Sequence, residues 1–167
     1  MKRLIIAAST AALLLAGSIS AASAANHVVI EQYGRGNGNA AAQYGEMNYN
    51  HVLQNGQLNS GRSVQRGYNN FLNMYQAGTN QAAGASQWGN DNYGVIGQEG
   101  VNHSAALTQT GINNIAGIAQ FGSNHTATTD QAGSNNAAAT IQVGDGQVAN
   151  TRQVGDGNMS IVVQGGM

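Results

Sequence analysis

The chain has 167 residues and a formal net charge of −1, and only 8% of its residues are Asp, Glu, Lys or Arg. This composition excludes a highly charged disordered tail and, with no Cys, a disulfide scaffold, and there is no basic stripe for nucleic acid. The nine aromatic residues add little bulk to an apolar content made up mostly of Ala and Val. The sequence therefore predicts that something other than a large apolar core holds the fold together.

Residues 1–24 have the three parts of a secretory signal peptide. Met1-Lys2-Arg3 is the basic start, residues 4–17 are mostly apolar, and Ala22-Ser23-Ala24 matches an A-x-A cleavage signal. The alternative is a transmembrane anchor, but the apolar run is shorter than the ~20 residues that span a bilayer. We therefore expect an exported chain whose mature part, residues 25–167, carries four Arg, seven acidic residues and no Lys.

From residue 26 the sequence is a tandem repeat of eleven residues with the pattern Q-x-G-x-x-N. The Gln positions are Gln32, Gln43, Gln54, Gln65, Gln76, Gln87, Gln98, Gln109, Gln120, Gln131, Gln142, Gln153 and Gln164. The Gly positions are Gly34, Gly45, Gly56, Gly67, Gly78, Gly89, Gly100, Gly111, Gly122, Gly133, Gly144, Gly155 and Gly166. The Asn positions are Asn37, Asn48, Asn59, Asn70, Asn92, Asn114, Asn136 and Asn158. The remaining four Asn positions hold Gln81, His103, His125 and Gln147. Because these four are spaced by 22, alternate units differ and the true period is 22 residues.

The turn chemistry of each unit predicts the fold class. Ten of the twelve residues at the fourth position after Gln are Gly, Asn or Asp, which tolerate a left-handed backbone; the exceptions are Met47 and Leu58. Together with the Gly two positions earlier they indicate a tight turn, and the seven residues from Asn to the next Gln are expected to form a strand. Two units make one strand-turn-strand rung. The prediction is an all-β, amyloid-like β-solenoid of about six and a half rungs over residues 25–167.

The alternation of side chains along a strand predicts which face is buried. Asn, the residues two and four positions later and the next Gln share one face, and that face is regular in every unit. The opposite face is irregular, and the aromatic residues fall on it or in the turns. A buried amide without a partner costs about 1–3 kcal/mol, but identical amides stacked ~4.8 Å apart pair as ladders. We therefore expect the Gln and Asn positions to form structural ladders inside the solenoid.

The two ends of such a stack are expected to be open strand edges. Neither end is guarded by Pro, Lys or a covering helix, and such edges invite another chain. The inward residues Val28, Ile30 and Val162 are predicted to contact a neighbouring copy. The sequence thus favours polymerisation over a capped repeat protein, and the irregular outward face argues against a soluble solenoid that binds ice or carbohydrate.

No catalytic, cofactor-binding or metal site is predicted, and we do not expect an enzyme. Asp145 and Asp156 each lie in a Gly-Asp-Gly turn, which favours solvated turns over paired catalytic carboxylates. His103 and His125 are expected to stack in place of ladder Asn, with metal binding as the alternative. The glycines at 34–38 resemble a phosphate loop only loosely, since no helix follows. The outward aromatics follow from β-propensity, with an adhesive surface as the alternative.

Units such as residues 43–48 and 109–114 resemble the curlin repeat, and the resemblance covers residues 26–167. It implies a bacterial curli subunit that leaves the cell through a dedicated outer-membrane pore and polymerises at the cell surface into amyloid fibres of the biofilm matrix, with roles in adhesion and aggregation. The implied partners are further copies of the chain, the other curli subunit, the secretion pore with its accessory factors, and a periplasmic inhibitor of assembly.

The sequence departs from the family pattern in two ways. The best-known major subunits carry a Gly-rich segment that addresses them to the pore, whereas strand register here starts at Asn26. The repeats are also more numerous than the usual five. The uninterrupted register to Gln164 favours a major subunit over a minor nucleator.

Overall fold

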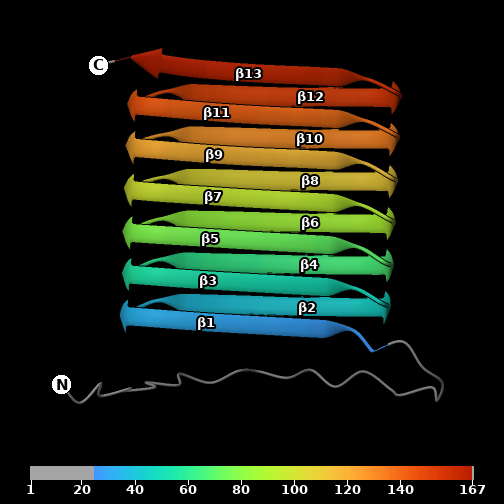
Figure 1. The fold of residues 1–167 in the computed structure, drawn as a ribbon, viewed down its shortest axis with the longest axis horizontal. Helices are drawn as coiled ribbons and strands as arrows, with labels where there is room; N and C mark the ends of the chain where they lie inside the picture. Colours follow the sequence, from blue (N-terminus) through green and yellow to red (C-terminus); the bar gives the residue numbers. More distant parts are fainter. Residues whose placement is uncertain (1–24, 167) are drawn as a thin grey trace.

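The computed structural model describes residues 25–166, so the predicted signal peptide lies outside the described part. That part consists of thirteen β-strands stacked in order, each joined to the next by two residues (Figure 1). It has no helix long and apolar enough to cross a membrane. The strands are β1 (His27–Arg35), β2 (Gly38–Glu46), β3 (Tyr49–Gln57), β4 (Ser60–Tyr68), β5 (Phe71–Thr79), β6 (Ala82–Asn90), β7 (Tyr93–Val101), β8 (Ser104–Ile112), β9 (Ile115–Ser123), β10 (Thr126–Ser134), β11 (Ala137–Asp145), β12 (Val148–Asp156) and β13 (Met159–Gly166).

The strands form two parallel sheets. The odd-numbered strands make a seven-stranded sheet, here called the odd sheet, and the even-numbered strands make a six-stranded sheet, the even sheet. The two sets of arrows run in opposite directions in Figure 1, so the chain crosses between the sheets at every turn. Every strand pairs in register with the strand 22 residues away, as Val52 with Met74 shows. The predicted all-β solenoid with a 22-residue period is confirmed.

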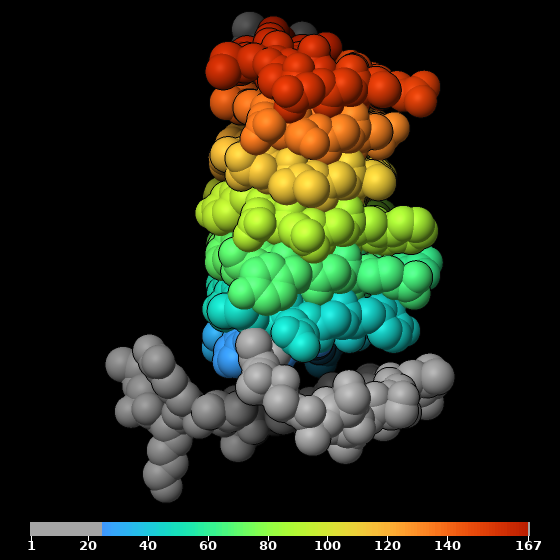
Figure 2. Space-filling view, turned by 90° about the vertical axis from the view of Figure 1, so that its right-hand side faces the viewer, coloured from blue at the N-terminus to red at the C-terminus, as the bar shows by residue number. Residues whose placement is uncertain are grey.

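The core is a thin layer between the two sheets. The odd sheet contributes large side chains such as Val52, Met74 and Ile96, and the even sheet contributes mostly small ones such as Ser63 and Ala85, all of them buried. The regular face is therefore inside, as the alternation predicted. Seen from one edge, the rungs lie one above another as layers (Figure 2).

The strand boundaries differ from the prediction. Each strand begins one residue after the Asn position, and β1 to β12 continue three residues past the Gln, as Tyr49–Gln57 shows for Gln54. The repeated Gly thus lies inside the strand, one residue before its end, and only two residues form the turn. These glycines keep the strand register while having positive φ, as at Gly56 with a φ of 130°. An L residue rarely adopts such a backbone, which explains why Gly recurs here.

All twelve residues at the fourth position after Gln have a left-handed backbone, including the two that are neither Gly, Asn nor Asp. Met47 has a φ of 58° and Leu58 has a φ of 57°. This conformation costs roughly 1–2 kcal/mol for most L residues. The 22-residue register of the stack therefore imposes a left-handed backbone on Met47 and Leu58, against the preference of these residues for a negative φ.

Two glycines of β9 differ in whether the structure leaves room for a side chain. A Cβ added at Gly122, where φ is 120°, would overlap the carbonyl oxygen of Gly144 in the next rung. A Cβ added at Gly117 would meet no atom within 4 Å. The repeated Gly is thus required by both backbone conformation and the close approach of stacked rungs.

We expect Gly122→Ala to lower the midpoint of unfolding in guanidinium chloride clearly, since the strained backbone alone costs on the order of 1–3 kcal/mol. Gly117→Ala, in the same strand, is the matched control and should leave the midpoint unchanged or raise it slightly. Equal midpoints for the two variants would contradict the close stacking of the glycines.

Candidate functional site

Two columns of Gln side chains run through the interior, one along each sheet. In each column the Nε2 of one Gln donates to the Oε1 of the Gln 22 residues later, with distances of 2.6–3.0 Å. The columns join all thirteen predicted Gln positions from Gln32 to Gln164. The predicted Gln ladders are therefore present and uninterrupted.

Each Gln amide from Gln43 to Gln164 also bonds to the main chain. Gln109 Nε2, for example, donates to the carbonyls of Tyr93 and Asn114 at 3.1 and 3.0 Å, besides Gln131 Oε1 at 3.0 Å. Tyr93 and Asn114 lie at the edge of the stack where the strands of the odd sheet begin. Because the amide nitrogen is needed at these carbonyls, its orientation is fixed, and all bonds of the ladder run in one direction.

A column of Asn side chains at one edge of the stack is equally regular. Its members are Asn26, Asn48, Asn70, Asn92, Asn114, Asn136 and Asn158. Each Asn from Asn48 onward donates Nδ2–H to the Oδ1 of the Asn one rung below at 2.8–3.0 Å. The same Oδ1 accepts a backbone N–H from the rung above it. Each rung is thus joined to the next at its turn as well as along its strands.

The column at the opposite edge is mixed, and it contains Asn37, Asn59, Gln81, His103, His125 and Gln147. The two His rings stack with centroids 5.0 Å apart. His103 Nδ1 accepts the backbone N–H of His125 at 3.3 Å, and His125 Nδ1 accepts that of Gln147 at 3.1 Å. Each Nε2 lies 3.0–3.1 Å from the carbonyl oxygen four residues earlier, which fixes a neutral ring with the proton on Nε2. Histidine therefore replaces ladder Asn, as the sequence suggested.

An outer row of amides, which the sequence analysis did not predict as a ladder, lies on the left-handed turn residues. Asn80 Nδ2 donates to Asn102 Oδ1 at 2.8 Å, and Asn113 to Asn135 at 2.8 Å. Asp145 accepts from Ser123 Oγ and from Asn124, and these hydrogen bonds lower the pKa of its carboxyl. The 22-residue spacing of the Asn pairs, such as Asn80 with Asn102 and Asn113 with Asn135, was the signal that could have revealed the row.

The outward faces of the two sheets differ, although the sequence analysis treated them as equally irregular. Four rings on the odd sheet, His27, Tyr49, Phe71 and Tyr93, stack in one column with centroids 4.7–5.2 Å apart. Further exposed apolar side chains of the odd sheet are Tyr75, Ile115, Ile141, Ile161 and Val163. The even sheet presents mainly Ser, Thr, Ala and Arg at the corresponding outward positions. The outward face of the odd sheet is thus the more apolar one, although the even sheet also exposes Tyr44, Trp88, Val148 and Val154.

The two ends of the stack expose complementary amide atoms. At the start, Gln43 Oε1 is buried and has no hydrogen-bond partner, and no Gln donates to Gln32 Oε1. At the other end, the Nε2 groups of Gln153 and Gln164 donate only to main-chain carbonyls. One end therefore offers acceptors and the other donors. The predicted contact residues Val28 and Ile30 lie at the first end, where each is 43% exposed, and Val162 lies at the second.

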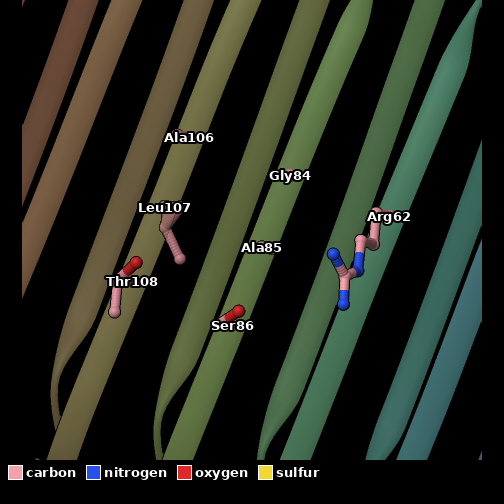
Figure 3. Close-up of a pocket in the computed structure, with 7 residues that line it drawn as sticks. All are labelled: Arg62, Gly84, Ala85, Ser86, Ala106, Leu107 and Thr108. Atoms are coloured by element: carbon pink, nitrogen blue, oxygen red, sulfur yellow. The ribbon is translucent and has the colours of Figure 1, made fainter.

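Between residues 25 and 166, no group of three or more His, Cys, Asp or Glu could hold a metal ion. A shallow depression on the even sheet is lined by Arg62, Gly84, Ala85, Ser86, Ala106, Leu107 and Thr108 (Figure 3). It exists because the outward residues next to Arg62 are small. No acid, His or Cys accompanies the arginine there.

Replacing a ladder Gln in mid-stack should destabilise the solenoid. Gln109→Leu leaves Gln131 Oε1 and two main-chain carbonyls without this donor, at about 1–3 kcal/mol for each group that stays unpaired. Thr110→Leu, which places the same side chain on the exposed outward face of β8, is the matched control. We expect a much lower unfolding midpoint for Gln109→Leu alone. Equal midpoints would contradict a contribution of the ladder to stability.

The buried His103 should make stability depend on pH. Burial lowers the pKa of His103 below its ordinary value, and its Nδ1 has no room for a proton while it accepts the His125 N–H. The unfolded chain takes up the proton below pH ~6.5, so this stability is fully present above that pH and is lost as the pH falls toward the folded pKa. His103→Asn should weaken the loss between pH 7 and 5, measured by unfolding midpoints. An unchanged slope would contradict the assigned ring state.

The family model described as the curlin associated repeat matches residues 89–122 and, in an overlapping second match, residues 104–133. No curated protein matches the chain significantly. The spacing of Gln and Gly inside the matched span is the same as that outside it, from Gln32 to Gln164. Residues 89–133 are thus shown to contain curlin associated repeats, and the same spacing of Gln and Gly continues on both sides of them.

Proposed function

We propose that this protein is a structural subunit that assembles end to end into an extracellular, curli-type amyloid fibre. The repeat family and the β-solenoid suggest a curli-type structural subunit rather than an enzyme. The proposal goes further in naming the polymer, its mode of growth and its place on the bacterial surface.

The observation that carries the proposal is the state of the two ends. Within the stack, each strand is paired on both sides in register, and each Gln amide bonds to the next. At the described ends, β1 and β2 on one side and β12 and β13 on the other leave these series open. Exposed edges of parallel strands bind further strands readily. The free donors of one end match the free acceptors of the other, so a second copy can continue both sheets.

Export completes the proposal. Residues 1–24 are proposed to act as a signal peptide that is removed, and the chain then reaches the surface through an outer-membrane secretion pore with its accessory factors. There it joins the fibre of the biofilm matrix, together with a second curli subunit that starts polymerisation. Adhesion and cell aggregation follow from a stiff fibre that displays the apolar side of the odd sheet.

The test is assembly of residues 25–167 in purified form. We expect fibres that give diffraction spacings near 4.7 Å along the fibre and near 10 Å across it, from strand and sheet separation respectively. A chain that stays monomeric after long incubation at high concentration, with or without preformed seeds, would refute the proposal.

Charge placed at an end should block growth without disturbing the interior. Val162→Asp puts a carboxylate on the inward side of β13, where a docked copy would bury it at a cost of several kcal/mol. Val163→Asp makes the same change on the outward side of that strand, where the side chain is 68% exposed. We expect elongation from wild-type seeds to be strongly slowed by the first substitution and nearly normal with the second at moderate salt. Wild-type elongation by Val162→Asp would show that chains assemble through their lateral faces.

A further inference from the structure

The described stack contains an odd number of strands, and this constrains how two copies fit together. The odd sheet has seven strands and the even sheet has six. If a second copy placed its odd sheet on the odd sheet of the first, β1 would dock on β13 and its β2 would lie two strand spacings above β12. One strand would then be missing from the even sheet at every junction, and the unpaired main-chain groups on both sides of the gap would remain.

We infer that successive copies are related by a half-turn about the long axis of the stack, so that β1 of one copy docks on β12 of the previous one and β2 docks on β13. This inference rests on the proposed function. A half-turn exchanges the two sheets and reverses the strand direction, so β1 runs parallel to β12 as the alternation in Figure 1 requires. Both sheets then continue without a gap, each switching between odd and even strands at the junction.

Charges at the two ends support this register. Glu31 and Arg152 each directly precede the Gln of their strand, and Arg35 and Asp156 each follow it by three residues. When β1 lies on β12 with Gln above Gln, Glu31 lies above Arg152 and Arg35 above Asp156. The first pair extends a charge alternation that already exists, because Arg152 Nε lies 3.6 Å from Asp130 Oδ2. Docking on β13 would instead place Glu31 above Val163. Opposite charges on neighbouring strands favour one pairing over others.

Buried polar atoms that lack partners support it as well. Both amide atoms of Asn39 and the Oε1 of Gln43 are buried on β2 without a hydrogen-bond partner among residues 25–166. With β2 on β13, Gln164 Nε2 lies below Gln43 Oε1, and the hydroxyl of Ser160 lies below the Asn39 amide. In the arrangement without rotation, β2 has no strand below it and these atoms stay unpaired. Buried polar groups in native proteins are nearly always paired.

The half-turn also decides how the fibre surface is organised. The apolar side of the odd sheet points to opposite sides of the fibre in successive copies. Each side of the fibre therefore alternates between seven strands of the more apolar surface and six strands of the more polar surface. Without rotation, the more apolar faces of all copies would lie on one side of the fibre. A continuous apolar surface of this kind promotes lateral association of fibres.

Disulfide trapping in assembled fibres tests the register, since the chain has no Cys of its own. Val29, Asn150, Ala40 and Ile161 all occupy the third position of their strands and point outward. Neighbouring in-register strands hold equivalent Cα atoms ~4.8 Å apart, which suits a disulfide. The half-turn brings Val29 next to Asn150 and Ala40 next to Ile161 of adjacent copies. The arrangement without rotation brings Val29 next to Ile161.

Three double variants are therefore assembled on wild-type seeds, oxidised mildly, dissolved in formic acid and separated without reductant. We expect most chains to be linked covalently in Val29→Cys/Asn150→Cys and in Ala40→Cys/Ile161→Cys, and few in Val29→Cys/Ile161→Cys. The four single variants control for lateral links. Linking of the third pair, or of no pair in well-formed fibres, would overturn the half-turn. Failure of the wild-type chain to form fibres would instead refute the proposed function, and with it this inference.

Charge reversal gives a second measurement that needs no new covalent bond. Arg35→Glu should slow elongation several-fold at low salt by facing Asp156, and Arg35→Glu/Asp156→Arg should restore the rate. Restoration should disappear when the reversed pair is moved to Arg35→Glu/Asp145→Arg, because β11 is not at the junction. Equal rates for all four proteins would overturn the proposed charge contact.

Discussion

Every feature of this molecule depends on one constraint: each residue lies above the residue 22 positions earlier in the chain. The parallel register of both sheets applies it to the backbone, and it brings like side chains within hydrogen-bonding distance. An amide that would be costly in an apolar core becomes a gain under this constraint, since its partners are always the amides of the neighbouring rungs. The thin apolar core, made of Ala with a few Ile, Leu, Val and Met side chains, can be small because the ladders beside it carry much of the cohesion.

The same constraint explains which parts of the structure were predictable. The Gln positions, the inward face and the stacked pair of His103 and His125 follow from counting residues, because equal spacing means equal position in the stack. The strand ends did not follow, since Gly56 and its equivalents were interpreted as turn residues whereas they keep the ladder with a positive φ. Sequence alone could not indicate this, because Gly is typical of both situations.

The ladder direction and the aromatic column were beyond the sequence analysis for different reasons. The direction is set by main-chain carbonyls such as that of Tyr93, whose position is known only when the strands are placed. The column of His27, Tyr49, Phe71 and Tyr93 has the same 22-residue spacing as the Gln residues, but its residue types vary and it ends at Ile115. An inward position tolerates few residue types because a buried amide needs its partner. An outward ring stacks equally well on several kinds of neighbour.

The two edges of the stack that contain the turns differ in whether their side chains distinguish one rung from the next. The edge made only of Asn is the same at every rung, so a strand that slipped by a whole rung would find identical partners there. The opposite edge reads Asn, Asn, Gln, His, His, Gln, and a slipped strand would put an amide where a ring must stack on a ring. When the chain folds rung by rung, a misaligned rung is therefore disfavoured at that edge. The mixed column therefore specifies the alignment of the rungs, which the side chains of a perfectly uniform repeat could not do.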